Sequence, residues 1–512
     1  MMIRSRAVAF FAIVSASCAI DIKATDVVIN VVNERYLSWN IDPSCNRGFH
    51  QINFTNPNLH AAGLYLSPSR LRFGGSGADF LRYSLTEGAP DCSDIVPAPP
   101  PLNPGCDYVT PGCLNASHFT DLLNFGTAAT ADFIFGVAFN YTEVCAVKTS
   151  PWDSSNAERL LTFFSVSNRT VWGCELGNEI NNNCDIPAQQ AAAVNTLASL
   201  LSQSNPTTTT TSTVHLVGPD VGGGGNPIEF AAQFLGNVTS GTMTAVTHHV
   251  YLSLERRDFD SPAILAKKLD SQIPVILEFV AMVRSSKAEG AQIWAGEMGP
   301  IGGGDDGSCG TNSTCGTFAS VFWYADDAAL RAAAGYTQHN RQTLFGGEYG
   351  LVNSAQSIMA LGPLEALKIR PDYWLAWLMK RTLGTSVYAA SSSDSLVRVY
   401  AWGGKPPSLF AAVTFCTPAA PQLLLLNLQA TSVAIALPFN ATSFALWSLA
   451  PSDGDVFSTS ATLNGVPLPV DIDVASIDPS TYLGFITTPP IVGKVSEGIT
   501  LPGWAVSVVC LA

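Results

Sequence analysis

Between about residue 45 and residue 388, short apolar runs alternate with longer stretches of helical period. The apolar runs lie at residues 70–73, 133–139, 170–176, 214–217, 245–249 and 292–295. The stretches with helical spacing lie at residues 155–164, 187–203, 262–285, 318–334 and 361–383. Strands that alternate with helices are typical of a parallel sheet. About eight such units predict a (β/α)8 TIM barrel over residues 45–388.

The pattern changes after residue 388. Residues 389–512 contain short alternating strands such as LVRVYAW, PQLLLLNL and AVSVVCLA, separated by turn residues. This pattern predicts an all-β sandwich. Residues 20–44 also alternate, and we expect these N-terminal strands to join the sandwich. The predicted fold class is therefore α/β, a TIM barrel followed by a C-terminal all-β sandwich domain.

The first 19 residues have the three parts of a secretory signal peptide. Arg4 and Arg6 form a basic start, residues 7–14 are apolar, and residues 15–19 are small. The alternative interpretation is a buried N-terminal strand. The predicted location is secreted or extracellular, with lysosomal, vacuolar or membrane-peripheral placement left open. Seven Asn-x-Ser/Thr sequons predict a glycoprotein. They begin at Asn53, Asn115, Asn140, Asn168, Asn237, Asn312 and Asn440.

Twelve cysteines suit an oxidising compartment. Removal of Cys18 with the signal peptide leaves an odd number, so at least one thiol is free or pairs between chains. No Cys-x-x-Cys pairs stand at zinc spacing, which argues against structural zinc. The predicted pairings are Cys309 with Cys315, bridges among Cys92, Cys106 and Cys113, and Cys416 with Cys510.

The composition excludes several kinds of partner. The formal net charge is −14, with 26 Lys and Arg against 40 Asp and Glu. Nucleic-acid binding needs a dense basic face, and strong attraction to a highly sulfated polymer needs one too. No later run of 18 apolar residues follows the start, so we expect no transmembrane span.

Two carboxylates stand immediately after predicted barrel strands, where the chemistry of a TIM barrel is located. Glu179 follows Asn178 in the segment VWGCELGNEI, and Glu297 lies in IWAGEMGPIGGG. Taken singly, each is readily explained as a polar loop residue. Together they belong to the fourth and seventh predicted strands, which face the same mouth. Paired carboxylates across a pocket are the arrangement that glycoside hydrolysis needs, and a spacing of roughly 5–5.5 Å retains configuration. No metal or organic cofactor is needed for that chemistry.

At this point the sequence resembles the heparanase-type endo-β-glucuronidases of glycoside hydrolase family 79. The resemblance covers most of the barrel, and its blocks follow one another in the family's order. They are residues 66–80, 134–140, 152–161, 171–180, 217–224, 247–251, 293–304, 344–352 and 370–387. The β-rich tail is similar to the family's C-terminal sandwich.

The resemblance implies a role for each matching residue. Glu179 is the acid/base and Glu297 the nucleophile. Asn178 contacts the substrate 2-hydroxyl, and His248 lines the subsite beside the nucleophile. Gly347 and Tyr349 hold the glucuronate carboxylate, and the loop with Gly302 and Gly303 does similar work. The implied partner is a glucuronate-containing polysaccharide or proteoglycan glycan. Peripheral membrane association and the oligomeric state stay open.

Several neighbouring side chains are interpreted as structural. Glu175 is expected to be a partner beneath the mouth, His249 a satisfied core histidine, and Asp220 a turn residue. Arg72 either supports Glu297 or forms an ordinary buried salt bridge.

The chain also departs from the family's pattern. Val250 stands where the mammalian enzymes have Tyr, so that Tyr251 either replaces it or a contact is lost. No basic cluster suited to heparan sulfate is present. Two other functions remain open, a retaining hydrolase of a neutral β-glycoside and a non-catalytic carbohydrate-binding protein on the same fold. The aglycone, exo or endo action and proteolytic activation are also open.

Overall fold

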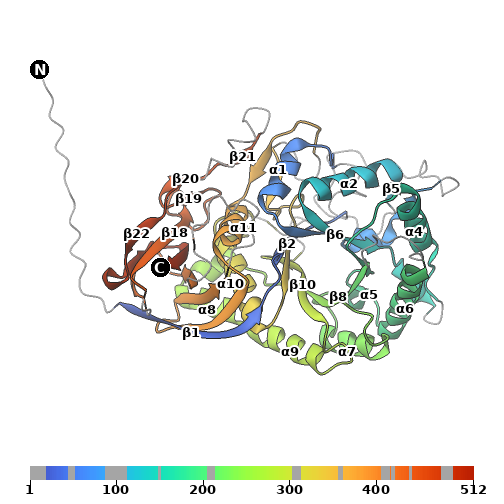
Figure 1. The fold of residues 1–512 in the computed structure, drawn as a ribbon, viewed down its shortest axis with the longest axis horizontal. Coiled ribbons are helices and arrows are strands. Elements are labelled where there is room, and N and C mark those ends of the chain that lie inside the picture. The colour runs from blue at the N-terminus through green and yellow to red at the C-terminus, as the bar shows by residue number, and fades with distance from the viewer. Residues whose placement is uncertain are drawn as a thin grey trace, which may run out of the picture.

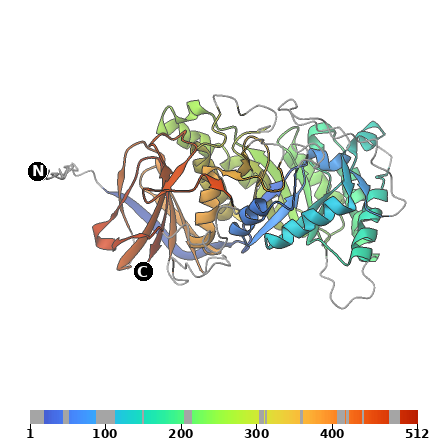
Figure 2. The same cartoon turned by 90° about the horizontal axis from the view of Figure 1, so that it is seen from above.

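The structure is a computed structural model. It describes residues 19–43, 52–86, 112–147, 151–203, 214–302, 309, 313–355, 361–404, 416, 421–437, 441–473 and 488–512. Figure 1 shows the barrel on one side and the β-sheet domain on the other, and Figure 2 shows the same two parts from above. Residues 1–18 of the predicted signal peptide lie outside the described residues, as do Gly303, Asn312 and Asn440.

Eight of the described strands close into a barrel, which confirms the predicted fold class. Every pair of neighbouring strands in this ring is parallel. In chain order the strands are β2 (Leu37–Ile41), β3 (Ser69–Phe73), β6 (Ala131–Val137), β7 (Gly173–Leu176), β8 (His215–Val221), β9 (Ala245–Tyr251), β10 (Gln292–Gly299) and β11 (Gln338–Arg341).

The last barrel strand is one that the pattern of apolar runs did not predict. β11 has the sequence QHNR, yet all four residues are buried. Each side chain finds polar partners inside the protein; for example, His339 bonds to Asp327 of a neighbouring helix at 2.6 Å. A buried polar strand has no hydrophobic signature, so periodicity does not reveal it.

Helices cover the outside of the barrel, and two predicted helices need correction. The stretch 262–285 divides into α8 (Pro262–Asp270) and α9 (Ile273–Arg284), because Pro274 lacks the N–H that a continuous helix requires. The stretch 361–383 contains β13 (Leu367–Ile369), and only then α11 (Pro371–Thr382) begins, with its proline in the first turn. The remaining helices are α1 (Pro57–Tyr65), α2 (Ala116–Ala128), α3 (Tyr141–Ala146), α4 (Ser155–Ser167), α5 (Ile180–Asn183), α6 (Pro187–Gln203), α7 (Pro227–Asn237) and α10 (Ala319–Ala334).

The N-terminal segment serves both parts of the molecule, which corrects the expectation that residues 20–44 join the sandwich as one piece. β1 (Ile20–Val31) pairs with β14 (Ser386–Ser392) and β17 (Val433–Ala436) of the C-terminal sheet. β2 instead enters the barrel between β11 and β3. A short turn separates the two strands, so the chain changes layer within a few residues.

The C-terminal domain contains one sheet of eleven described strands, of which ten follow one path and the eleventh pairs beside it. Its inner apolar cluster combines residues of the strands in the middle of the path with residues near one end, such as Ile435 and Leu501. The other strands are β15 (Val397–Gly403), β16 (Gln422–Asn427), β18 (Ser443–Pro451), β19 (Ala461–Leu463), β20 (Val466–Pro467), β22 (Ile491–Lys494), β23 (Ile499–Leu501) and β24 (Ala505–Leu511).

Helix α10 joins the two parts, since it packs on strands β1, β14 and β15 as well as on β11 of the barrel. A buried carboxylate on this helix bonds to side chains of the C-terminal sheet. Asp326 accepts a hydrogen bond from the Tyr400 hydroxyl at 2.5 Å and lies 3.4 Å from the Arg398 guanidinium. Burial raises the pKa of Asp326 to about 6, which Arg398 and Tyr400 oppose.

Three disulfides join described cysteines. Cys309–Cys315 and Cys416–Cys510 confirm predicted pairings, whereas Cys145–Cys184 was not predicted. The predicted bridges to Cys92 and Cys106 lie outside the described residues. Cys174, in barrel strand β7, is a buried free thiol. Within the described ranges, no helix is both long and apolar enough to cross a membrane.

The core between the sheet and the barrel provides a stability test. Leu424 in β16 is fully buried, so Leu424→Ala should cost about 2–5 kcal/mol through lost burial and the cavity left behind. Leu364 is 72% exposed and serves as the matched control, whose Ala variant should stay within about 0.5 kcal/mol of wild type. Guanidinium and thermal unfolding measure both changes, and equal effects would contradict this assignment of the core.

Candidate active site

Glu179 projects from a turn at the end of the fourth barrel strand. β7 ends at Leu176, and Gly177 then takes a φ of 80°, which favours glycine. Glu179 itself has a left-handed φ of 49°, and α5 begins directly after it. Its backbone N–H donates to the carbonyl of Asp220 at 2.9 Å. The turn is therefore tied to β8, and it leaves the Glu179 side chain 19% exposed at the mouth.

Glu297 lies within the seventh barrel strand, β10, and its side chain is 8% exposed. One oxygen of Glu179, one oxygen of Glu297 and a ring nitrogen of His249 all lie within 4.8 Å of one another. The structure thus brings together the two carboxylates that the sequence placed on the fourth and seventh strands.

A buried arginine lies beneath this pair. Arg72 of β3 donates from Nε to Glu175 at 2.6 Å and from Nη1 to Glu297 at 2.9 Å. Its Nη2 donates to the side-chain oxygen of Asn178 at 2.9 Å and lies 3.5 Å from Asp220. Arg72 therefore supports Glu297 and also forms the buried salt bridge with Glu175. Both interpretations of this residue are correct, because one planar guanidinium reaches partners on several strands.

His249 links the two carboxylates from the side. Its Nδ1 lies 2.9 Å from Glu179 and 3.7 Å from Glu297, and its Nε2 lies 3.2 Å from Asp220. An imidazole with carboxylates at both nitrogens can donate to both only as the imidazolium. Burial lowers the pKa of His249, but the charge of Glu297 and the hydrogen bonds to Asp220 and Glu179 outweigh it and raise the pKa to about 10.

The surroundings shift the pKa values of the buried acidic groups in different directions. Burial raises the pKa of Glu297, against the opposing charges of His249 and Arg72. Burial likewise raises the pKa of Glu175 to about 8 despite Arg72. Asp220 is buried too, yet Arg72 and His249 lower its pKa below the usual range. Of these three buried acids, Asp220 is the one whose pKa lies below its usual range.

Asp79, another acidic residue, helps to hold Asn178 in place beside Glu179. The backbone N–H of Asn178 donates to Asp79 at 3.0 Å, and the Asn178 side-chain nitrogen lies 3.3 Å from the Ser76 hydroxyl. Burial raises the pKa of Asp79 to about 8, although the backbone hydrogen bond from Asn178 lowers it. Asn178 is only 5% exposed, so these contacts and Arg72 fix its amide firmly.

The structure corrects the expectation for His248. Side chains alternate along a strand, so that His249 faces the barrel interior while His248 faces the helices outside. His248 stacks on Phe279 with ring centroids 3.9 Å apart. Its Nε2 lies 2.7 Å from the Tyr336 hydroxyl and 3.1 Å from Arg331. His248 is the satisfied core histidine, and His249 is the one beside the glutamates.

The same alternation carries Tyr251 into the site. Its hydroxyl donates a short hydrogen bond to Glu297. Val250 faces the other way and packs against the apolar core. Tyr251 therefore supplies the phenol at this place. The Tyr349 ring lies beside it, with centroids 6.4 Å apart, and is 3% exposed.

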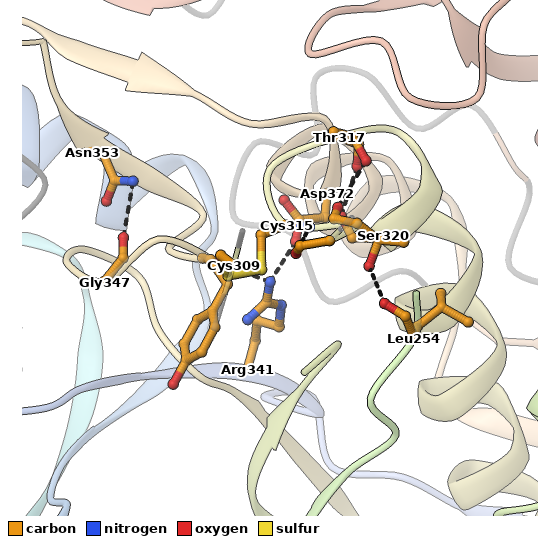
Figure 3. Close-up of a disulfide and its surroundings, with 12 residues drawn as sticks. Leu254, Cys309, Cys315, Thr317, Ser320, Arg341, Gly347, Asn353 and Asp372 are labelled. Carbon is orange, nitrogen blue, oxygen red and sulfur yellow. Dashed lines mark hydrogen bonds and ion pairs between the residues drawn. A yellow bond between two sulfur atoms is a disulfide. The ribbon is translucent and has the colours of Figure 1, made fainter. Parts of the chain in front are cut away.

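The loops that follow β10 and β11 hold the other predicted binding residues. Gly347 has a φ of 65°, and its carbonyl accepts a hydrogen bond from Asn353 at 3.1 Å. Figure 3 shows this pair beside the Cys309–Cys315 disulfide and the ion pair of Arg341 with Asp372, whose atoms are 2.6 Å apart.

The predicted glycine loop is described only in part. Gly302 is described, and a Cβ there would contact the Tyr251 side chain at 3.5 Å. Gly303 lies outside the described residues. Gly302 is thus placed next to the phenol that bonds to Glu297.

Three donors in the site have the residue types of a metal centre. Among the described residues, the donor atoms that lie close enough together to hold a metal ion belong to Glu179, His249 and Glu297. Their geometry favours another use, since the guanidinium of Arg72 already neutralises Glu297 and the His249 nitrogens both face carboxylates. A metal ion placed there would meet the positive charges of Arg72 and His249.

Two residues beside the carboxylate pair were not predicted to have a functional role. His249 and Asp220 were assigned structural places, yet each contacts a residue of the carboxylate pair. The signal that identifies His249 is strand parity, because β9 and β10 pair with His249 opposite Glu297. No comparable signal identifies Asp220, whose left-handed φ of 55° turns it into the site.

The comparisons with known proteins identify the family of the chain. The sequence model for "Glycosyl hydrolase family 79, N-terminal domain" matches residues 37–329. "Heparanase" of Gallus gallus is 28% identical over 416 residues, covering 72% of this chain and 73% of the relative. "Hyaluronoglucuronidase" of Hirudo nipponia is 25% identical over 438 residues, covering 81% and 84%.

A solved structure shows the same fold. The 4-O-alpha-L-rhamnosyl-beta-D-glucuronidase from Fusarium oxysporum 12S superposes with a TM-score of 0.59 at 12% identity, covering 96% of this chain and 100% of the other. Carboxylates paired across the mouth of such a barrel are the arrangement that glycoside hydrolysis uses, and the family match supports a glycoside hydrolase. The chain belongs to glycosyl hydrolase family 79.

The charge on His249 predicts a pH-dependent stability. Its pKa is about 10 in the folded protein and near 6.5 when unfolded, so its contribution is complete below pH 6.5 and is lost as the pH rises to 10. The melting-temperature difference between wild type and His249→Gln should therefore shrink across that window.

His339 provides the matched control for this measurement. It is another fully buried histidine, but burial lowers its pKa, so it does not change charge above pH 6.5. The difference between wild type and His339→Gln should stay constant over the same window. A constant difference for His249→Gln as well would show that His249 is neutral in the folded protein.

Proposed function

We propose that the protein is a retaining β-glucuronidase that acts on glucuronate-bearing glycans outside the cell. The observation that carries this proposal is the approach of the Glu179 and Glu297 carboxylates, with oxygens within 4.8 Å. Inverting enzymes separate their carboxyl groups by roughly 6.5–9.5 Å to admit a water, whereas retaining enzymes keep them at roughly 5–5.5 Å. The spacing therefore supports a covalent intermediate.

The contacts of the two glutamates support different roles. Glu297, held by Arg72 and by the Tyr251 hydroxyl, is the nucleophile that attacks the anomeric carbon. Glu179, more exposed and closer to the rim, gives its proton to the leaving oxygen and later activates water. The Asn178 amide beside them bonds to the 2-hydroxyl of the sugar.

Recognition of a glucuronate carboxylate is assigned to the loops around Gly347, Tyr349 and the segment with Gly302 and Gly303. Arg72 contacts carboxylates of the protein, and backbone N–H groups and phenols can bind an acidic sugar without an arginine. The relative from Hirudo nipponia, a hyaluronoglucuronidase, supports a glucuronide substrate. The net charge of −14 favours local recognition of one carboxylate over attraction of a polyanion.

Export is proposed on two features. Residues 1–19 have the pattern of a signal peptide, and disulfides such as Cys145–Cys184 are typical of an oxidising compartment. The proposed partner is a polysaccharide or a proteoglycan glycan in that compartment.

The test is a panel of aryl β-glycosides assayed between about pH 4 and pH 6. Wild type should cleave the glucuronide in preference to neutral glycosides, with retention of configuration seen by proton NMR. Glu297→Gln should abolish turnover, and Glu179→Gln should lower it by about 10²–10⁴-fold with a phenyl leaving group, because it removes the acid. Glu278→Gln, an exposed change on α9, is the control and should be neutral.

Each alternative has its own outcome. Preference for a neutral glycoside would make the protein a hydrolase of another sugar. Glycan binding without turnover would make it a binding protein. Turnover that survives Glu297→Gln would refute the assigned nucleophile.

A further inference from the structure

Asn182, in the short helix α5, contacts Glu179 twice. Its backbone N–H donates to the Glu179 carbonyl at 2.9 Å, and its side-chain Nδ2 donates to Oε2 of Glu179 at 2.7 Å. The other carboxylate oxygen, Oε1, lies 2.9 Å from Nδ1 of His249. The two oxygens of Glu179 are thus held by donors on different elements, α5 and β9.

The orientation of the Asn182 amide follows from its second partner. Its Oδ1 accepts the backbone N–H of Gly224 at 2.9 Å, and a backbone N–H can only donate. Oδ1 must therefore face Gly224, which turns Nδ2 toward Glu179. Asn181 adds to the same orientation, since its own amide nitrogen lies 3.3 Å from Oδ1 of Asn182.

The loop that provides this N–H is built from glycines because it packs directly on the pair. A Cβ at Gly222 would lie 2.6 Å from Cδ of Glu179 and 2.4 Å from Nδ2 of Asn182. A Cβ at Gly224 would lie 2.6 Å from Oδ1 of Asn182. Asn181 fastens the loop by accepting the Gly222 N–H at 2.8 Å and donating to the Gly224 carbonyl at 2.7 Å.

Helix α5 is also fixed from its other end. Cys184 directly follows Asn183 and is disulfide-bonded to Cys145 of α3. The four-residue helix is therefore attached at Glu179 to β8 and at Cys184 to α3. This attachment gives Asn182 a defined position although its side chain is exposed.

We propose that Asn182 is a positioning residue for Glu179, and that it holds the carboxyl group in the orientation in which it exchanges a proton with the substrate. This inference rests on the proposed function of Glu179 as the acid/base. In the first step the proton moves from the Glu179 carboxyl group to the glycosidic oxygen as the bond from that oxygen to the anomeric carbon breaks. The bonding electron pair stays on that oxygen, and a Glu297 oxygen bonds to the carbon.

The leaving group determines how much an aligned acid matters. A phenol leaves as a fairly basic oxygen and needs the proton, whereas 2,4-dinitrophenol leaves readily as its anion. Because kcat/KM reports the steps up to the first bond cleavage, a misaligned Glu179 affects the phenyl substrate selectively. A general loss of structure lowers kcat/KM for both substrates alike.

The experiment compares the phenyl and 2,4-dinitrophenyl β-glycosides of the sugar that wild type prefers. Asn182→Ala should lower kcat/KM about tenfold or more with phenyl, a part of the 10²–10⁴-fold that acid catalysis supplies, and less than about threefold with dinitrophenyl. Asn182→Asp keeps an acceptor for Gly224 but loses the donor, and should lose at least as much with phenyl. Asn183→Ala, at the next exposed position, is the matched control and should resemble wild type.

The outcomes separate this inference from the proposed function. Equal losses on both substrates, or no loss with phenyl, overturn the positioning role while the glycosidase assignment stands. A wild type that prefers a neutral sugar corrects the proposed substrate, and the Asn182 comparison proceeds on that sugar. A protein that cleaves none of the glycosides overturns both. Melting temperatures near that of wild type are expected for all three variants.

Discussion

The active site depends on one buried guanidinium. Arg72 is fully buried, and the barrel interior around it contains Glu175, Asp220 and Glu297. Isolated carboxylates at such depth are strongly disfavoured, so they need compensating charge or protonation. Arg72 supplies compensating charge and, together with His249, keeps Asp220 ionised. Burial instead favours the protonated forms of Glu175 and Asp79. The site is therefore a cluster of buried acids arranged around Arg72.

Contacts outside this cluster hold the turn that carries Glu179 at the mouth of the barrel. A glycine loop packs on Glu179 where side chains would collide, asparagines fasten it, and a disulfide closes the far end of α5. Glu297 needs no such support, because it lies within a strand whose neighbours on both sides are paired. Glu179, the more exposed carboxylate, lies on a turn, and these contacts offset the entropic cost of ordering that turn near solvent.

Much of this arrangement follows from strand ends, which the sequence reveals well. Glu179 and Glu297 were identified because apolar strands lead directly to them, and a TIM barrel brings such ends together. β11 was not predicted, because its four polar residues are satisfied by partners distant in the chain. Asp220 and Asn182 depend on backbone turns and on tertiary hydrogen bonds. The choice between His248 and His249 required the register between β9 and β10.

That register has a consequence for how related sequences are compared. Two identical residues stand side by side in β9, one inside the barrel and one outside. Inserting or deleting a single residue upstream within the strand would exchange their environments while leaving the dipeptide unchanged in an alignment. Matching the two letters therefore says little about which histidine meets the substrate. The histidine that faces the site is the one that pairs with Glu297 on the adjacent strand.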